Sequence, residues 1–241
     1  MSRLLYDNIV RMRRSFILKI ALLFFIAEPA IHIILAKNNP RVTEYGSVNI
    51  EGLYFIPMVF GVLAGTFLAH DYLHNTIRNK LIVGHTRVNI YLSNLICITA
   101  YLFIMILLYE GVAIGIGVPV IDDKNLDYDV MTKNMLFCIP MLIAVASIVV
   151  FLGMTVKSNA GTLAIFMFFY ASMAFGIFSI EPDLPYEWVK DVAKWLPSAQ
   201  LMTLTNVSAV EEPVRKIVYS LILTTASTAG GLAIFNKADL K

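Results

Sequence analysis

Six long apolar runs divide the chain, and each is about as long as a membrane-spanning helix. A bilayer core of about 30 Å requires roughly 20 apolar residues in an α-helix. Of the 241 residues, 58% are hydrophobic and only 15% are charged, whereas soluble domains average about 25% charged residues. The sequence therefore predicts an all-α membrane protein. The expected spans cover about residues 16–36, 53–73, 90–113, 135–156, 162–180 and 217–235.

The basic residues indicate how these spans are oriented. If both termini lie in the cytoplasm, 11 of the 19 Lys and Arg residues fall on the cytoplasmic side and 8 on the outer side. The positive-inside rule favours this arrangement. The first run follows three arginines, but it is too long for a signal peptide and no small-x-small cleavage site follows it. We therefore expect one domain, residues 1–241, with six spans and cytoplasmic N- and C-termini.

Two segments outside the spans also carry helical patterns. Residues 2–15 place apolar side chains broadly on one face and arginines on the other, which suits a helix at the inner membrane surface; a basic flank that only sets topology is the alternative. Residues 181–215 contain Trp188 and Trp195 and an apolar helical spacing broken by Pro197. We expect them to form a half-buried or re-entrant pair of helices at the outer face before the last span.

Several kinds of chemistry have no motif in the sequence. There is no Gly-x4-Gly-Lys-Ser/Thr phosphate loop, no His-Glu-x-x-His zinc motif and no Gly-x-Ser-x-Gly nucleophile elbow. The two cysteines, Cys97 and Cys138, lie in apolar runs and are expected to be buried free thiols. The four histidines do not form a ligand set, and a net charge of +2 is small for a nucleic-acid-binding protein. We therefore predict no catalytic, metal or nucleic-acid site.

Three ionisable residues lie within the expected spans. An intramembrane carboxylate costs roughly 2.5–3.5 kcal/mol on insertion scales, so it should have a partner or a wet cavity. Glu28 and His32 share a helix face at a spacing of four. They either form part of a translocation path or subunit interface, or simply neutralise each other. Glu110 lies near the outer end of its span, where reaching toward the headgroups accounts for it.

The segment HDYLHNTIRNKLIVGHTR, residues 70–87, is polar and basic although it lies between two apolar runs. The pattern predicts a helix from Asp71 that ends at Gly84, a residue common just after helix C-termini. Leu73, Ile77 and Leu81 would form its apolar face, and Arg78 and Lys80 its exposed face. It is either a membrane-surface connector or a docking helix for a cytoplasmic partner.

The run from His70 to Leu95 closely resembles the segment after the second span of ABC-2-type transporter permeases. That family has a carboxylate, an aromatic residue, a Gly-Thr-Ile/Leu step, Arg-Asn-Lys-Leu and a later Ser/Thr-Arg in this order. Two positions depart from the pattern. Asp71 replaces the usual Glu, and Asn75 replaces the usual Gly, although asparagine tolerates positive φ better than most residues. The matching residues here are Asp71, Tyr72, Asn75-Thr76-Ile77, Arg78-Asn79-Lys80-Leu81 and Thr86-Arg87.

This resemblance implies a permease subunit of an exporter of the type V ABC fold. It is similar to short permeases of phenol-soluble-modulin exporters and of lantibiotic or bacitracin immunity pumps. The implied complex contains a second six-span permease, identical or related, and two cytoplasmic ATPase subunits that bind ATP and Mg, so this chain would hold no cofactor itself. The helix between spans two and three would be the coupling helix that docks on the ATPase, with the N-terminal helix as a second contact. The implied docking residues are Asp71, Tyr72, Asn75, Thr76, Ile77, Arg78, Lys80 and Leu81.

The resemblance leaves the cargo open. An amphipathic or apolar substrate, such as a peptide or an antimicrobial, is the expectation, and the membrane would be a bacterial cytoplasmic membrane of the Gram-positive type. The alternatives are a membrane anchor or sensor that binds a cytoplasmic partner without transport, and an intramembrane enzyme that uses Glu28 and the histidines. For the enzyme, the sequence contains neither a nucleophile paired with a base nor a set of metal ligands.

Overall fold

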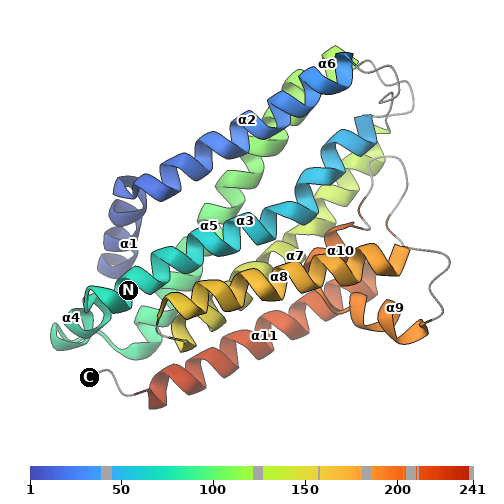
Figure 1. Ribbon diagram of the computed structural model, residues 1–241. Helices are drawn as coiled ribbons and strands as arrows, with labels where there is room; N and C mark the ends of the chain where they lie inside the picture. Colours follow the sequence, from blue (N-terminus) through green and yellow to red (C-terminus); the bar gives the residue numbers. More distant parts are fainter. Residues whose placement is uncertain are drawn as a thin grey trace.

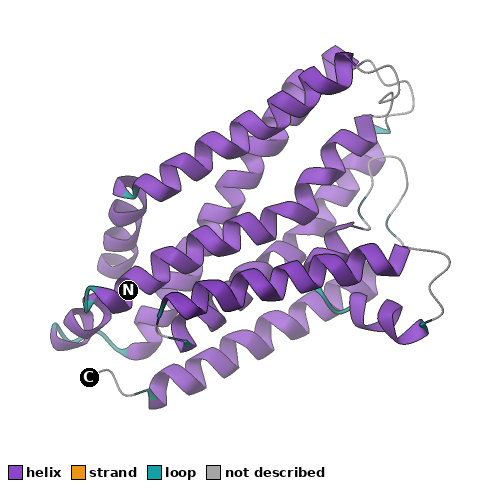
Figure 2. Ribbon diagram, viewed as in Figure 1, coloured by secondary structure: helices purple, strands orange, loops and turns teal. Residues whose placement is uncertain are grey.

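The computed structural model describes residues 1–38, 45–121, 127–156, 158–180, 186–202, 204, 210 and 212–238, without the side chains of 45–54, 121, 159 and 180. Within these residues the chain is helical apart from short turns and bends, and it contains no strand (Figure 2). The expected all-α class is confirmed.

Six long helices correspond one to one with the six expected spans, and all six are apolar and long enough to cross a bilayer. The chain is therefore a multi-pass membrane protein by the length and composition of its helices. The third span is longer than expected, because α5 continues through a π-helical turn, η1 (Ala113–Gly117), into α6 (Val118–Ile121). The long helices are α2 (Phe16–Asn38), α3 (Tyr45–Leu73), α5 (Arg87–Val112), α7 (Tyr128–Thr155), α8 (Asn159–Ile180) and α11 (Pro213–Lys237).

The shorter helices mark the two ends of the bundle (Figure 1). At one end, called here the terminal end, lie both chain termini, α1 (Ser2–Arg14) and α4 (Thr76–Ile82). Toward the other, called the opposite end, lie α6, α9 (Glu187–Ala193) and α10 (Pro197–Met202). Both termini thus lie at the same end of the bundle, as an even number of spans requires.

Small residues set the contact between α3 and α8. Gly61 and Gly65 form a Gly-x-x-x-Gly motif on α3, and each faces α8. A Cβ atom on Gly65 would lie 2.8 Å from Ile165 Cδ1 and 3.3 Å from Thr162 Cα. Small residues at this spacing allow membrane helices to approach closely, so that van der Waals contacts accumulate along the interface.

The helical pair expected before the last span is present as α9 and α10. Pro197 occupies the first turn of α10, where its missing N–H costs nothing. Gln200 is buried; its Nε2 donates to the Lys194 carbonyl at 2.6 Å, and its Oε1 accepts from Ser220 Oγ at 2.9 Å. The Trp195 ring stacks on Tyr219 with centroids 4.0 Å apart. These contacts fasten the pair to α11.

Candidate functional site at the terminal end

The polar segment after the second span is two helices rather than one. α3 continues to Leu73, and α4 begins at Thr76, so the expectation of one helix from Asp71 to Gly84 is wrong. The break lies at Asn75, which has left-handed backbone angles (φ 53°, ψ 21°). Asparagine is among the few residues other than glycine that adopt this conformation readily. Asn75 thus adopts the positive φ that the usual Gly of the ABC-2-type pattern would allow, and the chain turns there.

Gly84 ends α4, as the sequence predicted. Its φ is +95°, in the region that favours glycine. The Gly84 N–H donates to the Leu81 carbonyl at 2.9 Å, and the His85 N–H donates to the Lys80 carbonyl at 3.1 Å. These two bonds form a Schellman motif, which satisfies carbonyls that a helix end leaves free. The two backbone turns thus define α4 as a separate short helix.

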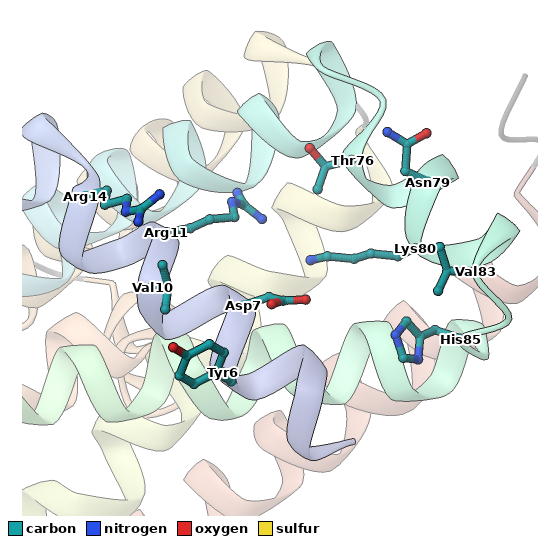
Figure 3. A pocket seen from close by; sticks show the side chains of 10 residues that line it. All are labelled: Tyr6, Asp7, Val10, Arg11, Arg14, Thr76, Asn79, Lys80, Val83 and His85. Atoms are coloured by element: carbon teal, nitrogen blue, oxygen red, sulfur yellow. The ribbon is translucent and has the colours of Figure 1, made fainter.

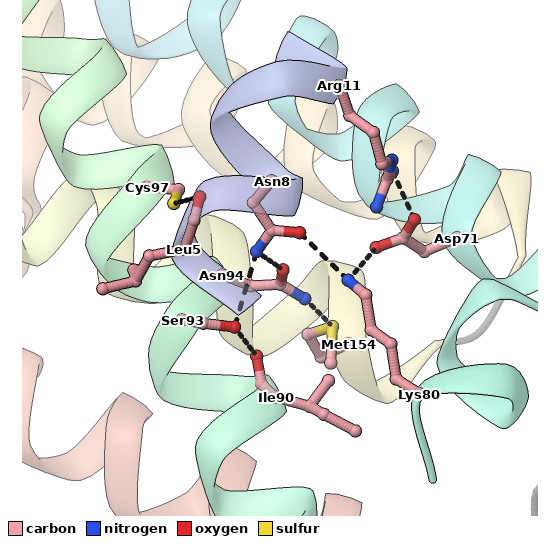
Figure 4. Close-up of polar contacts among 10 residues, drawn as sticks. All are labelled: Leu5, Asn8, Arg11, Asp71, Lys80, Ile90, Ser93, Asn94, Cys97 and Met154. Atoms are coloured by element: carbon pink, nitrogen blue, oxygen red, sulfur yellow. Dashed lines mark hydrogen bonds and ion pairs between the residues drawn. The ribbon is translucent and has the colours of Figure 1, made fainter. Parts of the chain in front are cut away.

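Asp71 is the centre of the buried charge at this end. Its side chain is fully buried, and its carboxylate forms an ion pair with Arg11 from α1 (Figure 4). Lys80 Nζ from α4 lies 3.8 Å from the other carboxylate oxygen. The Arg11 guanidinium also lies over the Phe67 ring, 4.6 Å from its centroid. One carboxylate on α3 therefore connects α1 and α4.

Lys80 is buried rather than exposed beside Arg78, so that part of the sequence prediction is wrong. Its side chain is only 9% exposed. Burial lowers the pKa of Lys80; Asp71 opposes this shift, and the Arg11 guanidinium adds to it. The physical reason for its position is spacing, because Lys80 lies three residues after the buried Ile77 and shares its face.

Asparagine side chains extend this contact into the bundle (Figure 4). Asn8 of α1 accepts a hydrogen bond from Lys80 Nζ at 2.9 Å and donates to Asn94 Oδ1 at 2.7 Å. Asn94 Nδ2 in turn donates to Met154 Sδ of α7 at 3.4 Å. Asn8 Nδ2 also approaches Ser93 Oγ at 3.4 Å. We call the connected set the inner polar cluster; its members are Asn8, Arg11, Asp71, Lys80, Ser93 and Asn94.

Sequence reasoning assigned no role to three members of this cluster, although each carries a signal. Asn8 lies midway between Leu4 and Met12 at spacings of four, within the stripe that α1 buries. Ser93 and Asn94 lie inside the third apolar run. Polar residues in such positions are costly unless paired, so they indicate a partner.

The eight implied docking residues divide between the interior and the surface. Asp71, Ile77 and Lys80 are buried, and Tyr72, Thr76 and Leu81 are half-buried. The Tyr72 hydroxyl donates to the Met154 carbonyl, which ties α3 to α7. Asn75 and Arg78 are exposed, as is Asn79, which follows Arg78 in the motif. These exposed residues are free to meet another molecule without rearrangement.

A cleft of about 540 Å³ separates α1 from α4 (Figure 3). Its walls carry three cations, Arg11, Arg14 and Lys80, and a single carboxylate, Asp7. Asn79 and Thr76 of α4 face it across from Tyr6 and Val10 of α1. With the Asp71 carboxylate behind Arg11 and Lys80 included, the cleft keeps an excess of one positive charge. Its two walls come from the N-terminal helix and from the helix between the second and third spans.

Arg87 fastens the C-terminus to the same end. Its guanidinium Nη1 donates to three carbonyls at the C-terminal end of α11: Phe235 at 2.8 Å and Asn236 at 3.0 Å in the last turn, and Ala238 at 2.6 Å just after it. A cation at a helix C-terminus also interacts favourably with the helix dipole. Arg87, the arginine of the Thr-Arg step, therefore joins α5 to the end of α11.

The ionisable residues within the spans lie apart from this cluster. His32 Nε2 is 3.2 Å from Glu28 Oε1, so the expected pair on α2 is confirmed. Glu110 is buried, only 7% exposed, and the span continues past it to Val120. The expectation that Glu110 reaches the headgroups is therefore wrong, since the longer third span places it in the interior.

Comparison with known proteins adds one family. None of the curated proteins compared with the chain matches it. The sequence pattern of a family described as "Protein of unknown function (DUF2705)" matches residues 42–240, from just before α3 to beyond the end of α11. The match includes Asp71, Lys80, Arg87 and Asn94 but begins after α1 and α2. Because it covers well over half of the sequence, the chain belongs to this family, DUF2705.

Proposed function

We propose that the chain is the membrane permease subunit of an ATP-driven ABC exporter. It would pair with a second six-span permease, identical or related, and each permease would bind one cytoplasmic ATPase subunit. ATP and Mg would be bound by the ATPases. The terminal end would face the cytoplasm, as the distribution of basic residues favours. The cargo would be an amphipathic or apolar molecule, such as a peptide or an antimicrobial.

The observation that carries this proposal is the position of α4. It is a short helix bounded by the turn at Asn75 and the Schellman motif at Gly84, and it projects from the bundle at the terminal end (Figure 1). Its inner face is held by Ile77 and Lys80, while Arg78 and Asn79 are exposed. A helix fixed on one face and open on the other is suited to dock into a groove of a partner. The resemblance of residues 70–95 to the coupling segment of ABC-2-type permeases agrees with this role.

The cleft between α1 and α4 supports a two-helix contact. Its excess of cations favours a partner surface that carries carboxylates, since complementary charge directs the encounter and fixes register. The partner would touch the exposed face of α4 and the outer face of α1 together. The two helices would then move as one unit, because Asp71 and Asn8 connect them through buried contacts.

The inner polar cluster offers a route from the docking helix to the spans. Closure of the ATPase dimer on ATP would displace α4, and Lys80 would carry that displacement to Asp71 on α3 and Asn8 on α1. Asn94 on α5 and Met154 on α7 follow in the same chain of hydrogen bonds. Access to the path would switch by movement of these helices against their neighbours. Glu28 and His32 would line that path or the interface with the second permease.

Co-purification with the candidate ATPase tests the proposal. The chain is expressed with an ATPase encoded beside it, purified, and assayed in nanodiscs for vanadate-sensitive ATP hydrolysis. Arg78→Glu reverses an exposed charge on α4 and should release the ATPase, because charge reversals at an interface cost several kcal/mol. Lys133→Glu, a reversal at another exposed position, on α7, is the control and should retain it.

The same assay distinguishes the alternatives. A complex that retains the ATPase in both variants at equal stoichiometry would remove Arg78 from the contact. A chain that purifies alone and never changes ATP hydrolysis would support the anchor or sensor instead. Permease activity is supported only if the wild-type chain both retains the ATPase and stimulates hydrolysis.

A further inference from the structure

A second cavity lies at the terminal end, on the side of α1 away from α4. It is a groove of about 770 Å³ between α1, α2 and α5. Ligand sites in proteins commonly measure about 300–1,000 Å³, so the groove is large enough to hold part of an organic molecule. Its floor is formed by α5, through Ile96, Ala100 and Ile104, all of which are exposed. We call this cavity the α1–α2–α5 groove.

The walls of the groove present hydrocarbon. Leu5, Ile9 and Leu22 line it from α1 and α2. The polar atoms that border it are already used: the Tyr101 hydroxyl donates to the Leu18 carbonyl at 2.6 Å, and Cys97 Sγ approaches the Leu5 carbonyl at 3.8 Å. Apart from Arg13 and Lys19, a ligand inside the groove would therefore meet mainly apolar side chains.

Two cations supply the only charge of the groove. Arg13 lies in the last turn of α1 and Lys19 in the first turn of α2, on either side of the bend at Ser15. Both side chains are exposed. No carboxylate lines the groove, and within the described part of the chain neither cation forms an ion pair. The groove thus combines an apolar channel with positive charge beside it, which is complementary to an amphiphile with one anionic head.

We propose that the α1–α2–α5 groove binds an anionic phospholipid of the surrounding membrane. One acyl chain lies along α5 against Ile96, Ala100 and Ile104, and the phosphate is held by Arg13 and Lys19. The membrane supplies this ligand directly, because α2 and α5 are spans and α1 lies where they end. Basic residues close to the membrane surface are the usual means by which proteins attract anionic headgroups. The site is independent of the proposed transport function.

Bound lipid would hold α1 against the bundle from the side opposite to the α1–α4 cleft. α1 contacts α5 through Asn8 and Leu5, and it turns into α2 at Ser15. A lipid wedged between these three helices would fix the angle of that turn. Membranes rich in anionic lipid should therefore favour one position of α1.

Native mass spectrometry of the purified chain tests the proposal. The chain is purified in mild detergent and titrated with phosphatidylglycerol or with phosphatidylcholine of the same acyl chains. Phosphatidylglycerol should bind in preference, and the double variant Arg13→Gln/Lys19→Gln should lose that preference, by about 30-fold if each cation contributes as it does at membrane surfaces. The matched control is Arg3→Gln/Lys237→Gln, which removes the same two residue types at the same end outside the groove.

A second variant separates the groove from general surface charge. Ala100→Trp places a large ring on the exposed floor and should displace the lipid while both cations remain. The proposal is overturned if the control loses as much preference as the double variant, if Ala100→Trp binds phosphatidylglycerol like the wild type, or if both lipids bind equally to the wild type. A bound mass that belongs to a non-lipid amphiphile in place of phospholipid would also overturn it.

Discussion

The two ends of the bundle are held together by different kinds of contact. At the terminal end, α1, α3, α4, α5 and α7 meet through buried charges and amides around Asp71. At the opposite end, α9 and α10 are fastened by the stacked Trp195 and Tyr219 rings and by the Gln200 amide, and the ion pairs there are exposed. Breaking a buried ion pair is costly because it strands the remaining charge, whereas exposed pairs contribute about 0–1 kcal/mol. The terminal end should therefore respond to a substitution as one connected unit, whereas the contacts at the opposite end can be lost one at a time.

Two natural thiols allow the ends to be followed separately. Cys97 on α5 is buried beside Leu5 of α1, and Cys138 is buried in α7, nearer the opposite end. Both are free, so a maleimide dye reacts with each only when its surroundings open. Peptide mapping after labelling reports the two sites independently.

The largest effect is expected from Asp71→Ala. The substitution leaves Arg11 and the buried Lys80 without their carboxylate, which should destabilise the chain by about 3 kcal/mol, the lower part of the range for a broken buried pair, since Arg11 is partly exposed. Labelling of Cys97 should accelerate far more than labelling of Cys138. Equal acceleration at both thiols would mean that the terminal end is not a separate unit.

Arg87→Ala should follow in size. It removes the charge-assisted hydrogen bonds from Nη1 to three carbonyls at the end of α11. This should lower the free energy of unfolding by about 2 kcal/mol. The change should appear as faster amide hydrogen exchange over residues 232–238, while the exchange of α9 stays as in the wild type. Arg78→Ala, the loss of a nearby exposed arginine, is the control; if it gave the same increase, the Arg87 contacts would not hold the C-terminus.

A smaller effect is expected from Gln200→Leu at the opposite end. The leucine preserves volume but removes the amide that accepts from the Ser220 hydroxyl and donates to the Lys194 carbonyl. The free energy of unfolding should fall by about 1 kcal/mol. With Trp188 replaced by Phe, the fluorescence of the remaining Trp195 should report looser stacking, and Cys97 labelling should not change. An effect on Cys97 as large as that of Asp71→Ala would contradict the separation of the two ends.

The smallest effect is expected from Asp191→Asn. The hydrogen bond from Lys194 lowers the pKa of Asp191, so the pair is present at neutral pH and is lost when the carboxylate is protonated in acid. Both partners are exposed, so solvent screens the interaction and the melting temperature should not change measurably. A clear drop in melting temperature at pH 7 would show that exposed pairs matter at this end.

The spans and the end of α4 could be predicted from sequence because their causes are local. Six apolar runs of sufficient length give six helices, and Gly84 ends α4 through its own backbone freedom. The break at Asn75 was not predicted, although asparagine tolerates its left-handed conformation. The helical pair before the last span followed from its aromatic residues and Pro197. Each of these signals lies within the segment it describes.

The inner polar cluster could not be predicted in the same way. Asn8 binds Asn94, 86 residues away, and one sequence does not indicate which helices meet. Lys80 was expected on the exposed face of α4 because it is charged. A helix of seven residues has too few apolar positions to show from sequence which of its sides is buried. Glu110 was misplaced because η1 and α6 extend the third span beyond its apolar centre.

Site-directed crosslinking tests the central claim that the exposed face of α4 docks on an ATPase at the terminal end. Cys97→Ala/Cys138→Ala provides a background without cysteine. Into it are placed Asn79→Cys on α4 or Trp188→Cys on α9, both exposed positions at different ends. Each variant is co-purified with the ATPase and treated with a thiol-to-amine crosslinker. The proposed function predicts a permease–ATPase adduct from Asn79→Cys and none from Trp188→Cys. An intact complex that gives no adduct from Asn79→Cys, or equal adducts from both positions, would contradict it.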